Sequence, residues 1–449
     1  MAVVVQSPIA KLPLLERLGL HRRELRAWAM YDWAISPVQT TIMVALFPIY
    51  FIQVAGADAG ATKAAQWWAL SNGIAITVVA VLSPILGAIA DYAAAKKKML
   101  AAAMSVGVLA CAGMFFIGTG ELRLASTLFV LAAIGAAAAV VFYDALLPHI
   151  ASEDEIDRVS TGAYAIGYFG GGVMLALNLA VVLKPQWFGL SGGDPTFPVR
   201  LSLASVAVWW VVFSIPMFRR VPEPPRRLEE DEQAGQNPAR VAFARLMETF
   251  HELRGYKHAF LMLLAFLIYN DGIATIQRMA AAYATELRIP QGSVIAAILI
   301  VQFVGIPATF LFGTLAGRIG AKRAIFTGLV VYLVISVVGY YMRTAAHFYV
   351  LAGLLGLVQG GTQALSRSMF AMLIPRYKSG EFFGFYSVFS KFAGIFGPFL
   401  FASIIGATGS SRNAILAVIL FFIAGGAILT FVNVEEGERA ARAAEEATH

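Results

Sequence analysis

Long apolar runs, separated by short polar connections, dominate the chain. The hydrocarbon core of a bilayer is about 30 Å thick, and a helix needs about 20 apolar residues to cross it. Twelve runs reach this length, so the sequence predicts an all-α membrane protein with twelve transmembrane helices. The predicted helices cover residues 27–51, 66–90, 98–118, 124–147, 160–183, 199–218, 259–283, 291–316, 322–342, 346–372, 382–407 and 412–433.

The seventh predicted helix carries four polar residues inside its apolar run: Asn270, Asp271, Gln277 and Arg278. A charged side chain at the bilayer centre costs roughly 2.5–3.5 kcal/mol on insertion scales, so such residues usually face a cavity or a partner. Asp271 and Arg278 are two helical turns apart on one face. We therefore expect this face to line a central substrate cavity. A buried structural pair of Asp271 with Arg278 is the alternative.

Three further helices place polar residues along one face. They are Asp32, Ser36 and Gln39 in the first helix, Gln359, Gln363, Ser366 and Arg367 in the tenth, and Ser387, Ser390 and Lys391 in the eleventh. We expect the three glutamines and Lys391 to contact substrate. Asp32 lies close to a helix end, which suits gating better than binding. Asp144, near the inner end of the fourth helix, is a candidate partner for Arg367 or Lys391, and helix packing is the alternative role for every member of the set.

The composition agrees with a membrane protein, since hydrophobic residues make up 59% of the chain and charged residues 14%, against about a quarter in soluble domains. Lys and Arg gather in the N-terminal arm, in the second-to-third connection and in the central linker. This asymmetry predicts that both termini are cytoplasmic. It also accounts for the net charge of +7 without a nucleic-acid partner. We expect a monomer in the plasma (inner) membrane, with lipid as its surroundings.

A charged, proline-rich segment divides the chain into two sets of six predicted helices. The expected divisions are an N-terminal bundle (1–218), a cytoplasmic linker (219–257), a C-terminal bundle (258–433) and a cytoplasmic tail (434–449). Within the linker, apolar residues at helical spacing in "ARVAFARLMETFHELRG" predict an amphipathic helix on the inner membrane surface. The halves also echo each other, because "GAIADYAAAKKK" ends the second helix and "GTLAGRIGAKR" ends the eighth. Such repeats are typical of transporters.

The first copy of this repeat resembles the conserved cytoplasmic loop of the major facilitator superfamily. Its residues are Gly87, Asp91, Lys96 and Lys97, whereas the second copy has Gly317 where the first has Asp91. Gly87 allows two helices to approach closely. Asp91, at a helix end, can bind the N-terminus of another helix or a basic partner. We therefore expect these four residues to act in gating, with Asp32, Asp144 and Arg367. A purely topological role for the lysines is the alternative.

A narrower resemblance covers nearly the whole chain. The stretches "WAMYDWAISPVQTTIMVALFPIYF", "FYDALLPHIASEDEIDRVSTGAYAIGYFGGG", "YNDGIATIQRMA" and "VQGGTQALSRSMFAMLIPRYKSGEFFGFYSVF" are similar to the autophagy-associated vacuolar effluxer family and its bacterial relatives. The resemblance implies a major facilitator fold and efflux of a solute such as an amino acid. Ile35 departs from this pattern, because an asparagine is expected after "YDWA".

Three classes of function remain in view: carrier, channel and membrane enzyme or lipid-handling protein. The chain lacks a nucleotide-binding G-x-x-x-x-G-K-[ST] motif, and its six histidines do not pair at metal spacing within a helix. We therefore expect no enzyme activity and no cofactor. The internal repeat favours a carrier of a small polar solute by alternating access. Arg278 and Lys391 are candidate anchors for an anionic group, and Asp271 as a proton carrier is a further hypothesis. A sugar, a nucleoside or a drug-like compound remains an alternative substrate.

Overall fold

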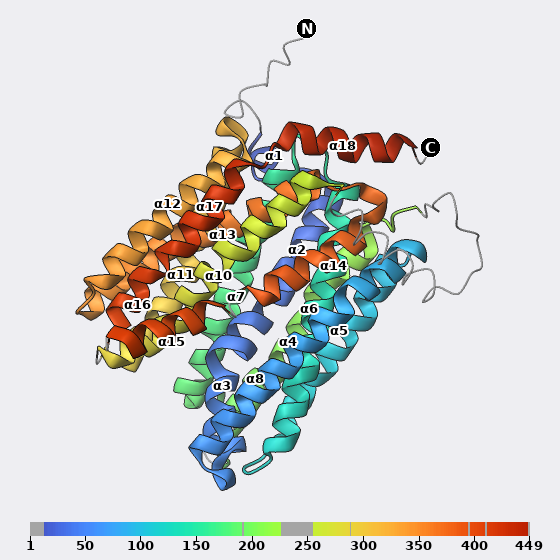
Figure 1. The fold of residues 1–449 in the computed structure, drawn as a ribbon. Helices are drawn as coiled ribbons and strands as arrows, with labels where there is room; N and C mark the ends of the chain where they lie inside the picture. The colour runs from blue at the N-terminus through green and yellow to red at the C-terminus, as the bar shows by residue number, and fades with distance from the viewer. Residues whose placement is uncertain are drawn as a thin grey trace.

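The computed structural model describes residues 13–190, 193–225, 255–287, 289–393, 396–408 and 411–447. The part described is a helical bundle whose halves run side by side (Figure 1). The N-terminal half comprises α1 (Leu14–Arg17), α2 (Arg23–Pro37) with its continuation through η2 (Val38–Ala45), α3 (Leu46–Tyr50) and η3 (Phe51–Ala55), then α4 (Ala61–Tyr92), α5 (Lys96–Gly113), α6 (Leu122–Ile150), α7 (Ile156–Leu183) and α8 (Phe197–Arg220).

The C-terminal half is built from a matching series of helices. It comprises α10 (Lys257–Glu286), α11 (Gln291–Ile319), α12 (Ala321–Tyr340), α13 (Ala345–Met372), α14 (Ser379–Phe392), α15 (Phe396–Thr408), α16 (Ser411–Ala417), α17 (Ile419–Thr430) and α18 (Val434–Ala447). The predicted tail therefore contains a helix, α18, which lies across one end of the bundle. We call this the α18 end; α1 lies there too (Figure 1). The amphipathic helix predicted for the linker lies outside the described residues.

Eleven helical segments in the described parts of the chain are long and apolar enough to span a membrane. The prediction of an all-α membrane protein is confirmed, while the cytoplasmic placement of its termini stays a prediction. The eleventh span was expected to be one helix over 382–407. It is instead two shorter helices, α14 and α15. Proline lacks a backbone N–H and clashes within a continuous helix, but it is tolerated in a first turn. Pro398 occupies the first turn of α15, which favours a new helix start at this place.

The first span also departs from a regular α-helix. Pro37 cannot donate a hydrogen bond to the carbonyl of Trp33, one turn earlier. The Nε1–H of Trp209 on α8 donates to this carbonyl instead, at 3.1 Å. Directly after Pro37 the helix widens into the π-helical segment η2. Side chains of the same half therefore satisfy the backbone group that the proline leaves open, as a membrane interior requires.

Two helix pairs make the most extensive contacts between the halves: α4 packs along α14, and α7 packs along α11. Both contacts use glycine for close approach. A Cβ on Gly87 of α4 would overlap the carbonyl oxygen of Gly380, and one on Gly313 of α11 would overlap the Thr161 hydroxyl of α7. Small residues let helix backbones meet in this way in membranes. The two pairs thus form the surfaces along which the halves meet.

Candidate functional site between the two halves

A buried arginine joins three helices at the contact between the halves. Arg367, on α13 of the C-terminal half, is 2% exposed. Its Nη1 donates to Oδ1 of Asp144 on α6 at 3.0 Å and lies 3.5 Å from Oδ2 of Asp32 on α2. Asp144 was expected to pair with Arg367 or Lys391, and its contact with Arg367 is present. The gating role assigned to the three residues stays a prediction.

The remaining donors of Arg367 bind the start of α7. Its Nε donates to the hydroxyl of Ser160 at 2.9 Å, and its Nη2 donates to the Ser160 carbonyl at 3.0 Å. The same hydroxyl donates to the carbonyl of Ala364 on α13 at 2.7 Å. The planar guanidinium thus has partners on both its Nε and Nη edges, which lysine could not reproduce. The sequence analysis missed Ser160, because the spacing along one helix does not reveal contacts with another.

Aromatic rings enclose the guanidinium and fix one of the carboxylates. The Arg367 Cζ lies 4.5 Å from the ring centre of Tyr164 and 4.9 Å from that of Trp28, within the range of cation–π attraction. The hydroxyl of Tyr143, whose ring stacks on Trp28, donates to Oδ2 of Asp32 at 2.9 Å. These aromatic residues stand in "WAMYDWA", "FYDALLP" and "GAYAIG", stretches that the sequence analysis used only for the family resemblance.

A second polar contact between the halves involves the predicted loop motif. Oδ2 of Asp91, at the end of α4, accepts a hydrogen bond from the backbone N–H of Glu381 in the first turn of α14, at 2.9 Å. Asp91 also forms a buried ion pair with Lys96. Both partner types expected for Asp91, a helix N-terminus and a base, are therefore present. A carboxylate at this position is favoured by the helix dipole and the unpaired N–H groups.

The other lysine of the motif, Lys97, contacts residues of its own half. Lys97 Nζ donates to the carbonyl of Val221 at 2.6 Å, and its backbone N–H donates to the carboxylate of Glu223 at 3.0 Å. Both partners follow the end of α8. Lys97 therefore ties the start of α5 to the segment that leaves the N-terminal half. Burial raises the pKa of the half-buried Glu223, while the N–H groups of Lys97 and Lys96 and their charges act in the opposite direction.

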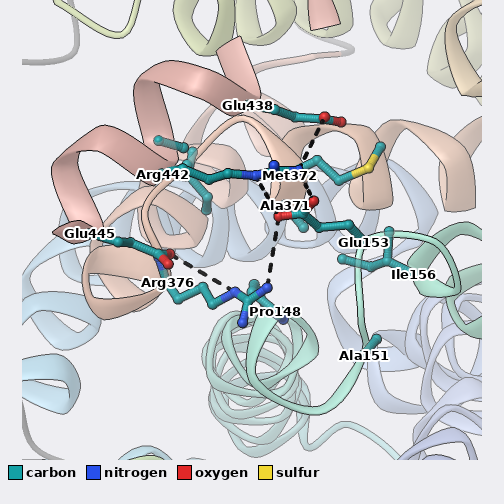
Figure 2. A pocket seen from close by; sticks show the side chains of 12 residues that line it. Pro148, Ala151, Glu153, Ile156, Ala371, Met372, Arg376, Glu438, Arg442 and Glu445 are labelled. Atoms are coloured by element: carbon teal, nitrogen blue, oxygen red, sulfur yellow. Dashed lines mark hydrogen bonds and ion pairs between the residues drawn. The ribbon is translucent and has the colours of Figure 1, made fainter. Parts of the chain in front are cut away.

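The helix α18 forms a third connection across the α18 end. Figure 2 shows a chain of alternating charges that runs from Glu438 through Arg442, Glu153 and Arg376 to Glu445. Glu153 belongs to the connection between α6 and α7, so the Arg442–Glu153 pair joins the C-terminal helix to the N-terminal half. Burial, and next the Glu153 carboxylate, raise the pKa of Glu438.

The ion pairs of α18 should make a small, measurable contribution to holding the two halves together at the α18 end. Exposed ion pairs contribute about 0–1 kcal/mol. Arg442→Ala should therefore raise the fraction of molecules whose halves are separated at the α18 end by at most about fivefold. Arg439→Ala is the control, because among the described residues the Arg439 guanidinium bonds within its own helix, to the carbonyl of Glu435. Distances between spin labels at Lys98 and Arg323, in a Cys111→Ala background, would report the opening. Equal distance distributions for the two variants would refute this role of Arg442.

Asp271 binds a helix N-terminus as well. Its side chain is buried, with Oδ1 accepting from the N–H of Gly397 at 2.9 Å and Oδ2 from the N–H of Phe396 at 3.1 Å. These residues open α15, the second part of the broken eleventh span. Asp271 also lines an apolar groove of about 320 Å³ between α10, α15 and α17. The described contacts of Asp271 thus lie within the C-terminal half, and its expected contact with substrate stays a prediction.

The remaining candidate substrate residues are dispersed. Gln39 and Gln277 are exposed, Asn270 is buried, and Gln359 and Gln363 are half-buried. Of these, Gln359 precedes Gly360, which packs against the Tyr168 ring of α7, so it lies at the contact between the halves. The side chains of Arg278 and Lys391 lie outside those that the structure describes, so their expected role as anchors for an anion stays a prediction.

Solved structures with the same arrangement of helices are carriers of the major facilitator superfamily. A proton:xylose symporter aligns with a TM-score of 0.68 at 13% identity over 92% of this chain and 95% of its own. A bacterial homologue of the iron transporter ferroportin, in an outward-facing state, aligns with a TM-score of 0.65 at 16% identity over 91% and 98%. At these identities the likeness establishes the fold.

The sequence comparisons define the family within that fold. The profile of the family described as "Vacuole effluxer Atg22 like" matches residues 63–442. An uncharacterized MFS-type transporter of Bacillus subtilis is 36% identical over 92% of this chain and 95% of its own length. Autophagy-related protein 22 of Yarrowia lipolytica is 27% identical over 63% of this chain, a match that spans 51% of the fungal protein. The chain belongs to the Atg22-like family of major facilitator transporters.

Proposed function

We propose that the chain is a secondary transporter that exports a small polar solute across the plasma membrane by alternating access of its two halves. The observation that carries the proposal is the clustering of polar contacts between the halves at the α18 end. Asp91 meets the start of α14, Arg367 meets Asp144, and α18 meets Glu153. Each contact joins one half to the other, so all of them separate when the halves part at this end.

The clustering describes a state that is closed at the α18 end. With the termini in the cytoplasm, as the distribution of Lys and Arg predicts, this closed end faces the cytoplasm. On this orientation, we interpret the closed state as outward-facing. A carrier of this kind rocks its halves about a site near the bilayer midplane. The contacts at the α18 end would act as the inner gate.

Amino acids are the first substrate class to test. The family description as vacuole effluxers supports export, and a zwitterion would suit a site that offers both a base and an acid. Desolvated charge pairs discriminate strongly, because a ligand that lacks one charge leaves a buried group unpaired. Transport by a monomer with proton coupling is part of the same proposal.

Counterflow in proteoliposomes tests the proposal. Purified protein would be reconstituted with an excess of unlabelled solute inside, and uptake of labelled amino acids, sugars and nucleosides would be followed. We expect saturable counterflow of at least one amino acid at a rate well above that of empty liposomes. Counterflow of sugars or nucleosides alone would move the substrate to another class. A folded protein that exchanges none of the three would contradict the proposed function for these solutes.

A further inference from the structure

Among the described side chains around Arg367, two acids face one cation. Asp32 and Asp144 lie on two helices of the N-terminal half, and one guanidinium, that of Arg367, faces both of them. The side chains of the two acids are 15% and 9% exposed. If both acids were ionised, a net negative charge would remain in a place with little access to water. An uncompensated buried charge is strongly unfavourable.

Arg367 contacts the two acids unequally. Arg367 uses Nε and Nη2 on Ser160, which leaves Nη1 for the two acids. Nη1 lies 3.0 Å from Asp144 but 3.5 Å from Asp32, a distance at which a hydrogen bond is weak. The Tyr143 hydroxyl supplies the stronger contact to Asp32. Arg367 thus pairs closely with Asp144 and only weakly with Asp32.

The helices around Asp32 and Asp144 place aromatic rings near the two acids. Among the described side chains, they place no cation there besides Arg367. The titratable groups that act on the two acids or on Arg367 are tyrosines: Tyr31 from α2, Tyr143 from α6, Tyr164 from α7 and Tyr386 from α14. A neutral phenol can donate a hydrogen bond but cannot offset a charge. A proton on one of the two carboxylates would remove this excess charge.

We propose that Asp32 and Asp144 form a proton-binding site that holds one proton in this closed state. The inference rests on the proposed function only where it links the proton to transport. Arg367 belongs to the half that moves away when the α18 end opens, whereas both acids stay with the other half. Protonation of the acids and the position of Arg367 are therefore linked, and each alters the free energy of the other. The described donors to Asp271 belong to its own half, so it serves as the comparison.

Infrared spectroscopy of the purified protein in liposomes tests the site without a substrate. A protonated carboxyl group gives a carboxylic-acid C=O band, which an ionised carboxylate lacks. We expect the wild type to show one such band that titrates with pH. We expect both Asp32→Asn and Asp144→Asn to lose it, because a single carboxylate can pair with Arg367 as an ion. Asp271→Asn should keep the band.

Three results would overturn the proposal: a wild type without the band across the pH range of the folded protein, a band that survives in Asp32→Asn or Asp144→Asn, or a band that disappears in Asp271→Asn. The wild-type titration decides the matter even if one variant fails to fold, and the other variant then locates the proton. Failure of the counterflow assay with wild-type protein would refute the proposed transport function and leave the infrared result unaffected. The two ideas therefore fail separately.

Discussion

Gly87→Ala is expected to slow transport about tenfold or more, whereas Gly73→Ala on the same helix should leave the rate unchanged. A Cβ on Gly87 would overlap the backbone carbonyl of Gly380, while one on Gly73 meets nothing within 4 Å. The Gly380 carbonyl belongs to the first turn of α14, so it cannot rotate away as a side chain can. Overpacking a close contact costs typically 1–3 kcal/mol, and each 1.4 kcal/mol changes an equilibrium tenfold.

The added methyl group should act on one state of the transporter in particular. Contact between Gly87 and Gly380 exists only when the halves meet at the α18 end, so the substitution should disfavour this closed state. Spin labels at Lys98 and Arg323 should then show longer distances in Gly87→Ala than in Gly73→Ala, with equal thermal stability. A Gly87→Ala protein with the wild-type distances and rate would show that the helices adjust to the methyl group and that the close contact is dispensable.

The sequence was sufficient to predict most of the membrane helices, because burial in lipid requires long apolar runs whatever the tertiary contacts are. It was insufficient for the eleventh span, where hydropathy is continuous across the break between α14 and α15. The local signal was Gly397 followed by Pro398, a pair that favours a helix start over a helix interior. Hydropathy averages over a window and does not register the loss of one backbone donor.

For the candidate site too, the sequence predicted some contacts and missed others. Asp91 at a helix end needed a donor or a base, and its partners are Glu381 N–H and Lys96. The pairing of Asp144 with Arg367 was one of two options, since charge alone does not select between two cations. Ser160 could not be predicted at all, because its role depends on the approach of α7 to α13. Spacing along one helix determines which residues share a face, but not which face meets a distant helix.

Asp271→Ala should lower the thermal stability of the protein strongly, and Asp271→Asn should lower it less. Alanine leaves the N–H groups of Phe396 and Gly397 without their carboxylate acceptor. An unsatisfied buried donor costs about 1–3 kcal/mol in proteins, and loss of an N-terminal cap costs about 0.5–2 kcal/mol. Asparagine keeps one acceptor oxygen of similar size, so it should retain one of the two hydrogen bonds. Thermal unfolding in detergent, followed by circular dichroism, would rank the two variants.

A glycine variant separates the cap from the charge of Asp271. A Cβ on Gly397 would overlap the hydroxyl of Thr275 and press on the Asp271 carboxylate, so Gly397→Ala should disturb the same contact with the charge intact; Gly353→Ala, at a position with open space, is its control. If capping is the role of Asp271, Gly397→Ala and Asp271→Ala should destabilise the protein alike. Asp271→Asn with wild-type stability, intact counterflow and no gradient-driven uptake would instead assign the carboxylate to proton coupling. That result would also argue against a role in coupling for the proton held by Asp32 and Asp144.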